Sequence, residues 1–526
     1  MRYPRGKGDF CLKELACTPT FAAMMEKGAF AKWILAFVIL VVAVLWSSCT
    51  PEDMILDDST AQLEFSTDTL RFDTIFTQLG SATRTLKVYN RYDKRVRIDR
   101  IAFTQGSVSR FRMNINGWMG KEITDVEILP HDSIYVFVEV TIDPDQPPSV
   151  SPFIFTEDLL FEWNEHSQRV VLEAWGQNAN YIPSRFHKDS IVVFECNGGE
   201  VVWDDPKPYV VYGIVAFEDC TLRIPAGVRI YVHGGLTRTE DEQGNPLIYN
   251  SGRLFIGPNG RLVVEGTLDE PVIFEGDRLE PEFADEPGQW TGIIFAPGST
   301  GNSIEHAVIR NSLVGVWVDS AAQLSLRNTR IYNTTGSAVV GRHATITAGN
   351  CLFYNCGADA VRLGHGGTYR FDYCTLASYG VDAGALSLSN GICYDPLCQN
   401  FDINKLFARF RNCIIAGSRR DEISLSDFTS GQDPALFDYR LQYCVVRVDE
   451  LLDEPNGYPD FFSYCDPCIN VAFDTPLFAN VAEDDYHLDS LSVAIGLAQP
   501  LMGFELDLEG WMRDDAPDAG CLEWHP

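Results

Sequence analysis

Two histidines in the middle of the chain, His343 and His365, are the side chains best suited to acid–base chemistry. A histidine can take up or release a proton near neutral pH, and a nearby arginine can neutralise the carboxylate of a substrate. The charged residues beside the two histidines are Arg342, Arg362 and Asp359. If the chain is an enzyme, we expect one histidine to be the base and one of the arginines to hold the substrate.

The histidines fall in a stretch, residues 305–446, that repeats one short phrase. Its copies begin at His306, Asn328, Asn350, Tyr373, Asn412 and Tyr443. The first four copies are about 22 or 23 residues apart, and the last two follow longer insertions. A period of this length, with extra loops on some turns, is typical of a solenoid. We therefore predict that each copy belongs to one coil of a parallel β-helix.

The aligned copies form columns of similar residues, as stacked strands require. One column contains small side chains: Ala307, Thr329, Cys351, Cys374, Cys413 and Cys444. The next column but one is bulky and apolar: Ile309, Ile331, Phe353, Leu376, Ile415 and Val446. Apolar residues at every second position predict a strand with alternate side chains in the core. Just past this strand we expect an asparagine ladder at tight turns, formed by Asn311, Asn333 and Asn355.

Two further strands align in each coil. The second strand contributes Val316, Val339, Val361 and Leu386, and the third contributes Leu324, Ile346, Tyr369, Ala408 and Tyr439. Three short strands per turn predict a right-handed parallel β-helix over residues 181–475. Counting along the second strand places Trp317 in an outward column with Arg362, and Asp319 in one with Arg342. Trp317 and Asp319 are therefore the expected binding residues.

This pattern resembles the pectate-lyase-like superfamily of secreted and surface proteins over roughly the last two thirds of the chain. The phrase Trp290-Thr-Gly292-Ile293, just before the regular coils, is also familiar from bacterial β-helix proteins. The resemblance implies that catalysis, where it occurs, takes place on the outward face of one parallel sheet.

The motifs of the known enzymes of this architecture are incomplete here. Gly364-His365-Gly366 is similar to the Gly-His-Gly of polygalacturonases, but the paired aspartates before it and the Arg-x-Lys after it are missing. The acidic triplet that binds calcium in pectate lyases is not placed on adjacent coils. We therefore expect no cofactor, and calcium has no predicted site.

Eight of the twelve cysteines that follow residue 49 fall into two groups. Those in the small inward column are expected to be buried apolar residues rather than disulfides. Two pairs lie in loops and are predicted disulfides of an exported protein: Cys393 with Cys398, and Cys465 with Cys468. A single Cys-x-x-Cys lacks the second pair that a zinc site needs, so we predict no metal site.

Length and charge narrow the range of partners. A chain of 526 residues is long for one compact domain, and two or more cores are expected. The formal net charge of -32 repels phosphate backbones, so we expect no nucleic-acid partner. An acidic polysaccharide is disfavoured for the same reason, unless a local basic patch or a bound cation offsets the field.

The N-terminal segment resembles a bacterial lipoprotein signal. An apolar run from Trp33 to Trp46 precedes Ser-Ser-Cys49 and is too short to span a bilayer comfortably. The resemblance implies removal of residues 1–48 and lipidation of Cys49, although Trp46 stands where the usual motif has leucine. Residues 49–59 form an acidic tether similar to the export signals of Bacteroidota lipoproteins. We expect a lipid-anchored protein of the outer membrane, exposed at the cell surface; the alternative is an uncleaved membrane anchor.

Residues 60–180 show the alternation of half-buried strands, most clearly at Ile134, Val136, Val138, Val140 and Ile142. Several short strands at this spacing predict an antiparallel β-sandwich of immunoglobulin type. It resembles the immunoglobulin-like domains of Bacteroidota surface proteins, which implies a spacer or a binding platform. Residues 476–526 resemble the closing segment of surface β-helix proteins, and we expect them to wrap the last coil as a cap.

The expected protein is thus all-β, an immunoglobulin-like sandwich followed by a β-helix on a membrane anchor. The first functional hypothesis is binding or display, with a glycan or a surface protein as partner. The second is a polysaccharide lyase or glycoside hydrolase that uses the face with the two histidines. The third is a structural subunit of an envelope assembly. Fold alone does not choose among them.

Overall fold

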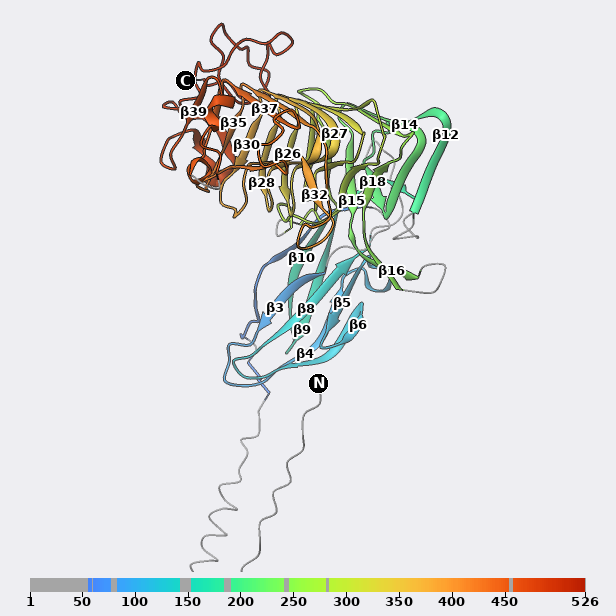
Figure 1. The fold of residues 1–526 in the computed structure, drawn as a ribbon. Helices are drawn as coiled ribbons and strands as arrows, with labels where there is room; N and C mark the ends of the chain where they lie inside the picture. Colours follow the sequence, from blue (N-terminus) through green and yellow to red (C-terminus); the bar gives the residue numbers. More distant parts are fainter. Residues whose placement is uncertain are drawn as a thin grey trace, which may run out of the picture.

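The computed structural model describes residues 55–58, 60–76, 83–141, 153–183, 191–240, 246–280, 283–453 and 457–525. In these residues the regular structure is β, apart from short 3₁₀ helices. A pair of facing sheets is followed by a stack of parallel coils (Figure 1). Across the same ranges, no helix has both the length and the apolar character needed to cross a membrane. The predicted signal and Cys49 lie outside the described residues.

Two five-stranded sheets form the first part. The first contains, in order, β1 (Glu64–Phe65), β3 (Arg84–Tyr89), β8 (Ser133–Val140), β5 (Phe111–Ile115) and β6 (Trp118–Gly120). The second contains β2 (Thr69–Phe76), β10 (His166–Gln177), β9 (Phe153–Trp163), β4 (Val96–Phe103) and β7 (Glu122–Ile128). Neighbouring strands are antiparallel, except that β2 runs parallel to β10.

The two sheets share one hydrophobic core. In β8, the buried side chains are Ile134, Val136, Val138 and Val140, which confirms the predicted alternation. Ile142 lies outside the described residues. The second sheet contributes Ile98, Phe103, Leu159 and Phe161 to the same core. Alternate residues of each strand point inward, so the polar residues between them remain in water.

The coils share a long parallel sheet made of one strand from each turn. Its order is β11 (Asn180–Ile182), β13 (Tyr209–Tyr212), β15 (Arg229–His233), β20 (Val272–Gly276), β23 (Ala307–Arg310), β26 (Arg330–Thr334), β28 (Leu352–Cys356), β30 (Thr375–Ser378), β35 (Ile414–Gly417), β38 (Cys444–Val446) and β39 (Cys468–Asn470). From β23 to β38 these strands carry the six copies of the repeated phrase. Successive coils are therefore stacked along one direction, as in a parallel β-helix.

A second sheet contains the other strands of each coil. Its main path is β24 (Val316–Val318), β21 (Gly292–Phe295), β18 (Arg253–Ile256), β14 (Ile214–Pro225), β19 (Arg261–Glu265), β22 (Asn302–Glu305), β25 (Gln323–Arg327), β27 (Val339–Gly349), β29 (Val361–Asp372), β31 (Leu386–Ser389) and β36 (Ile423–Ser426). Three strands join it at the side: β12 (Ile191–Val202), β34 (Leu406–Arg411) and β37 (Phe437–Gln442).

The predicted second and third strands of a coil are not always separate. In β27 and β29 one continuous strand runs through both positions. The corner inside each strand has positive φ, at His343 (51°) in β27 and at His365 (59°), Gly366 (74°) and Gly367 (123°) in β29. Pairing between the two strands shifts register at this point and then continues. This register shift is a β-bulge, and the chain turns the corner through it without leaving the sheet. Both strand positions therefore belong to one sheet, although the sequence predicted separate short strands.

The predicted columns are confirmed in the core. The bulky column, from Ile309 to Val446, is fully buried, and its members pair with one another in register. The small column is equally buried, and its four cysteines are free thiols. The asparagine ladder is confirmed between Asn355 and Asn333, whose side chains lie 3.3 Å apart. Asn311 instead donates to main-chain carbonyls of the preceding loop.

Loop disulfides occur where the sequence predicts them, between Cys393 and Cys398 and between Cys465 and Cys468. The first closes a hairpin, β32 (Gly391–Cys393) with β33 (Phe401–Ile403), inserted between β31 and β34. A third disulfide, Cys196–Cys220, links β12 to β14 and was not predicted. It joins neighbouring strands at the start of the stack, where the repeat pattern gave no alignment.

The C-terminal segment lies along the side of the coils rather than over the last coil. Its apolar residues pack on outward residues of β28, β30 and β35. Arg513 donates to Asn350, and the Cys521 amide donates to Thr375. Phe461, which is buried, covers the last coil by packing near Tyr439 of β37. The segment was expected to wrap the last coil, but the exposed apolar face of three neighbouring strands offers it more area to bury.

Glu422, just before β36, gives the coils a pH-dependent stability. Its side chain is fully buried, and the Arg419 amide donates to Oε1 at 2.6 Å. In the part of the chain that the structure describes, Oε2 has no hydrogen-bond partner. Burial raises the pKa of this carboxyl from 4.5 to about 7. A raised pKa favours the protonated folded state, so stability is full below the unfolded pKa. We expect the free energy of unfolding to fall by roughly 3 kcal/mol as the pH rises through this range.

Denaturant unfolding of Glu422→Gln across this pH range measures the effect. The variant keeps the shape of the side chain and cannot ionise, so its stability should fall less with pH than that of the wild type. The matched control is Glu483→Gln at an exposed position, which should keep the wild-type slope. An equal slope in Glu422→Gln would contradict the assignment.

Candidate functional site

The two histidines lie side by side on adjacent coils, at the corner of β27 and β29. Their ring centroids are 5.8 Å apart with the planes tilted by 45°. Both side chains are half-buried, and among the described residues the buried Nδ1 of His343 has no hydrogen-bond partner. The sequence-based expectation that these residues stack one coil apart is therefore confirmed.

His365 has two partners that compete for one nitrogen. Its Nε2 lies 3.0 Å from Oδ2 of Asp402 and 2.7 Å from Nδ2 of Asn404, both supplied by the inserted hairpin and the residues after it. A protonated Nε2 donates to the Asp402 carboxylate, whereas an unprotonated Nε2 accepts from the Asn404 amide. The two contacts cannot form together. The presence or absence of a hydrogen on Nε2, which in the neutral ring is set by the tautomer, therefore decides which of the two residues binds it.

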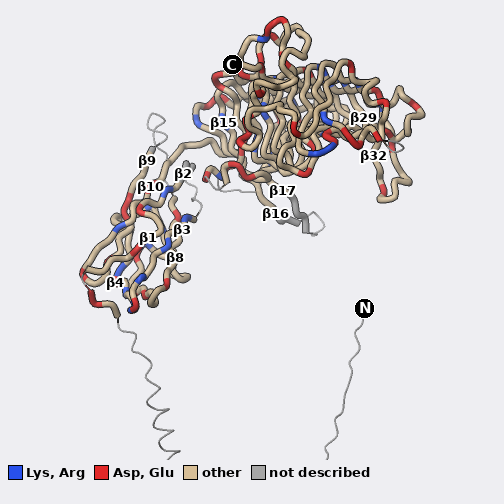
Figure 2. Tube along the Cα trace, turned by 90° about the vertical axis from the view of Figure 1, so that its left-hand side faces the viewer, with Lys and Arg blue, Asp and Glu red and all other residues tan. Residues whose placement is uncertain are grey.

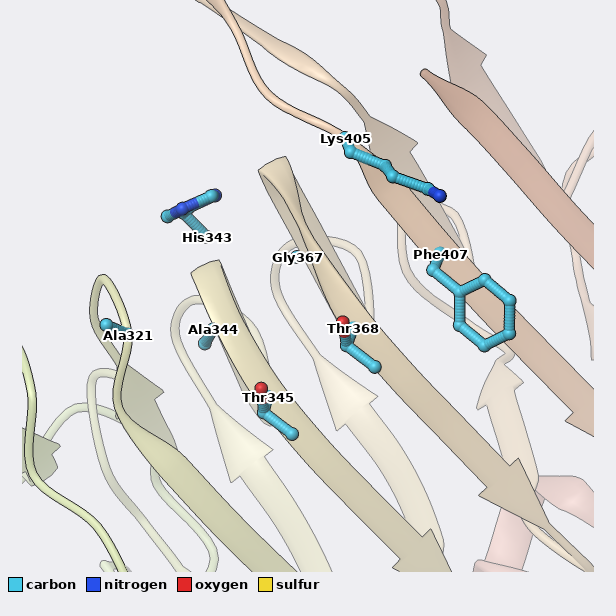
Figure 3. A pocket seen from close by; sticks show the side chains of 8 residues that line it. All are labelled: Ala321, His343, Ala344, Thr345, Gly367, Thr368, Lys405 and Phe407. Carbon is cyan, nitrogen blue, oxygen red and sulfur yellow. The ribbon is translucent and has the colours of Figure 1, made fainter. Parts of the chain in front are cut away.

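A groove of about 420 Å³ begins at this corner and crosses successive coils. Its lining residues are Ala321, His343, Ala344, Thr345, Gly367, Thr368, Lys405 and Phe407. Figure 3 shows Thr345, Thr368 and Phe407 on neighbouring strands below His343, with Lys405 at the start of its strand. The strand register places the same three residues in one outward column. The groove thus offers hydroxyls, an imidazole, an ammonium group and one aromatic ring.

The other predicted site residues lie on the part of each coil that comes before the corner. Arg362 forms an ion pair with Asp359 at 2.9 Å, and Arg342 lies 4.0 Å from Asp319. The column of Trp317, Val340 and Arg362 pairs in the predicted register. None of these residues lines the groove around His343. The structure therefore divides the predicted polar set between two faces on either side of the corner, and a catalytic role for it stays a prediction.

Sequence reasoning missed the partners that complete the corner. Asp402, Asn404 and Lys405 come from an insertion, and no repeat column aligned them. The available signal for Thr345 and Thr368 was their place shortly after each histidine, two residues after His343 and three residues after His365. In the described ranges, no group of three or more His, Cys, Asp and Glu side chains is placed to hold a metal ion.

Comparisons with known proteins were made for the sequence and for the fold. No model of a known family matches the sequence, and a search of curated proteins finds no matching relative. A protein of unknown function from Porphyromonas gingivalis W83 aligns over 26% of this chain at 11% identity and a TM-score of 0.17. The present chain covers 59% of that protein, so it spans less than two thirds of it.

Two glycoside hydrolases are similar at the same low level. The catalytic unit of a GH87 alpha-1,3-glucanase from Streptomyces thermodiastaticus strain HF3-3 aligns over 69% of this chain and 72% of that chain, at 10% identity and a TM-score of 0.23. A family 123 glycoside hydrolase from Clostridium perfringens aligns over 35% and 38%, at 8% identity and a TM-score of 0.15. Similarity at these scores does not indicate an activity. The groove itself is therefore the basis for a functional proposal.

Proposed function

We propose that this protein binds a polysaccharide in the groove lined by His343, Thr345, Thr368, Lys405 and Phe407. The observation that carries the proposal is a row of side chains on three successive coils, Thr345, Thr368 and Phe407, with the polar groups of His343 and Lys405 beside it. Adjacent strands are about 4.8 Å apart, so the groove presents similar contacts at regular intervals. A polymer of similar sugar units can use such contacts in succession, whereas a small molecule would use one set.

The proposal also gives a role to the other parts of the chain. A right-handed β-helix carries the groove, and the paired sheets before it act as an immunoglobulin-like spacer. Lipidation of Cys49 after removal of residues 1–48 anchors the protein in the outer membrane, with the groove facing the exterior. The support for this anchor is the sequence of the apolar run and the cysteine that follows it.

Phe407 provides the sharpest test of binding in the groove. Its half-buried ring offers an apolar face to a sugar, and we expect Phe407→Ala to weaken binding about tenfold, or roughly 1.4 kcal/mol. Titration calorimetry against a panel of polysaccharides measures the affinity. Phe137→Ala is the matched control, because Phe137 is an exposed phenylalanine on β8 of the paired sheets. Equal affinities for both variants, with unchanged melting temperatures, would place binding elsewhere.

A second function, hydrolysis or lyase cleavage of the same polymer, is favoured by the contact between His365 and Asp402. A carboxylate that holds one imidazole nitrogen leaves the other nitrogen free to exchange a proton with substrate. Incubation with polysaccharides, followed by reducing-end and unsaturated-product assays, separates the two functions. An enzyme would lose turnover in a His343→Ala/His365→Ala variant by a much larger factor than it loses affinity. A binding protein would release no product at all.

A further inference from the structure

Three arginines form one outward column next to the groove. The register of β29, β34 and β37 pairs Arg370 with Arg409 and Arg409 with Arg440, so the three lie on successive coils. Each is two residues beyond the column that contains Thr368 and Phe407. The guanidinium of Arg409 lies over the Phe407 ring, 3.8 Å from its centre. The arginine column is therefore continuous with the groove.

Part of this positive charge is not neutralised within the described residues. Arg370 and Lys405 are exposed, and neither has an acidic side chain within ion-pair distance there. Arg440 is exposed and donates to the main-chain carbonyl of Ser463. Arg409 is the exception, because it pairs with Asp438 at 2.8 Å. The guanidinium groups of Arg370 and Arg440 thus keep donors available to a ligand.

Basic residues are in the minority on this chain. Acidic residues outnumber lysine and arginine by 73 to 41, and many arginines are paired, as Arg411 is with Asp372 and Arg362 with Asp359. Figure 2 shows basic positions beside β29 on a trace with many acidic positions. At physiological salt, charges are screened beyond about 8 Å. A ligand bound at the column therefore experiences these cations more strongly than the distant acidic surface.

We infer that the groove takes an acidic polysaccharide, whose carboxylate or sulfate groups bind along Arg370, Arg409 and Arg440 while its sugar rings contact Phe407. The inference rests on the proposed function and names the substrate class of the same groove. An arginine can bind a carboxylate or sulfate through two parallel hydrogen bonds. Arginines one coil apart can hold acidic groups on a polymer in succession, with Lys405 as a further cation at the corner. This local basic patch would let an acidic polymer bind even though the protein as a whole is strongly acidic.

Matched pairs of polymers test the inference with the full chain. Polygalacturonate and its methyl ester differ in carboxylate charge, and dextran sulfate and dextran differ in sulfate charge. We expect the acidic member of at least one pair to bind about tenfold more tightly, with an affinity that falls as salt rises. Preference in the first pair identifies carboxylate as the recognised group, and preference in the second identifies sulfate.

Substitution of the column separates this inference from the proposed function. The triple variant Arg370→Gln/Arg409→Gln/Arg440→Gln should lose the preference for acidic polymers and still bind the neutral ones. If this variant does not fold, the double variant Arg370→Gln/Lys405→Gln takes its place. The control is an exposed set on the paired sheets, Arg91→Gln/Arg112→Gln/Arg169→Gln. Equal binding of acidic and neutral polymers, or a preference that survives in the folded column variants, overturns the inference alone. Binding of none of the four polymers overturns the proposed function as well.

Discussion

Replacement of Arg513 by alanine is expected to lower the free energy of unfolding by about 3–5 kcal/mol. The Arg513 side chain is only 2% exposed and forms an ion pair with the buried Glu523. It also donates to Asn350 of the coils at 3.1 Å and lies over the Tyr373 ring, 3.9 Å from its centre. Its loss leaves a buried carboxylate without its cation and removes a link between the C-terminal segment and the coils.

Denaturant unfolding measures this effect, and two further variants interpret it. Arg513→Met/Glu523→Gln removes both charges and should recover part of the stability, because no unpaired charge remains buried. Arg420→Ala removes an exposed arginine paired with Asp449, and should cost less than about 1 kcal/mol. If Arg513→Ala were as mild as Arg420→Ala, the C-terminal segment would not be held to the coils through this arginine.

Replacement of Trp290 by alanine should be similarly costly, at about 3–5 kcal/mol. Trp290 is 1% exposed in the core of the coils, and its Nε1 donates to the Arg310 carbonyl at 2.8 Å. The alanine variant leaves a large cavity and an unpaired carbonyl. Thermal and denaturant unfolding of the whole chain should both show the loss.

The conservative variant Trp290→Phe separates the two contributions. It keeps most of the ring volume and removes the indole donor, so we expect a loss of about 1–3 kcal/mol. Equal losses for Trp290→Phe and Trp290→Ala would assign the effect to the hydrogen bond. The neighbouring Gly292 has φ of 123°, and an added Cβ would lie 1.9 Å from the Val314 carbonyl oxygen. This close approach of the next coil gives a physical reason for the Trp-x-Gly phrase.

The two halves of the candidate site differed in how far sequence could predict them. The stacking of His343 on His365 followed from the repeat, since residues at the same place in successive coils must lie one strand apart. The partners Asp402 and Asn404 come from the inserted hairpin, whose path no repeat constrains. The arginine column could have been aligned from the sequence, because its members lie two residues after aligned positions. The sequence could not show that Arg409 pairs with Asp438 while Arg370 and Arg440 have no acidic partner in the described residues.

Residue pattern alone predicted the stacked coils, the inward columns and the loop disulfides. This was possible because side chains alternate along a strand and the same alternation recurs in every coil. The local pattern therefore shows directly how the coils stack. Three-dimensional contacts were needed to establish where the C-terminal segment packs, which residues hold His365, and which arginines lack an acidic partner in the described residues. Those features depend on contacts between segments far apart in the chain, for which hydrophobic period and residue spacing contain no signal.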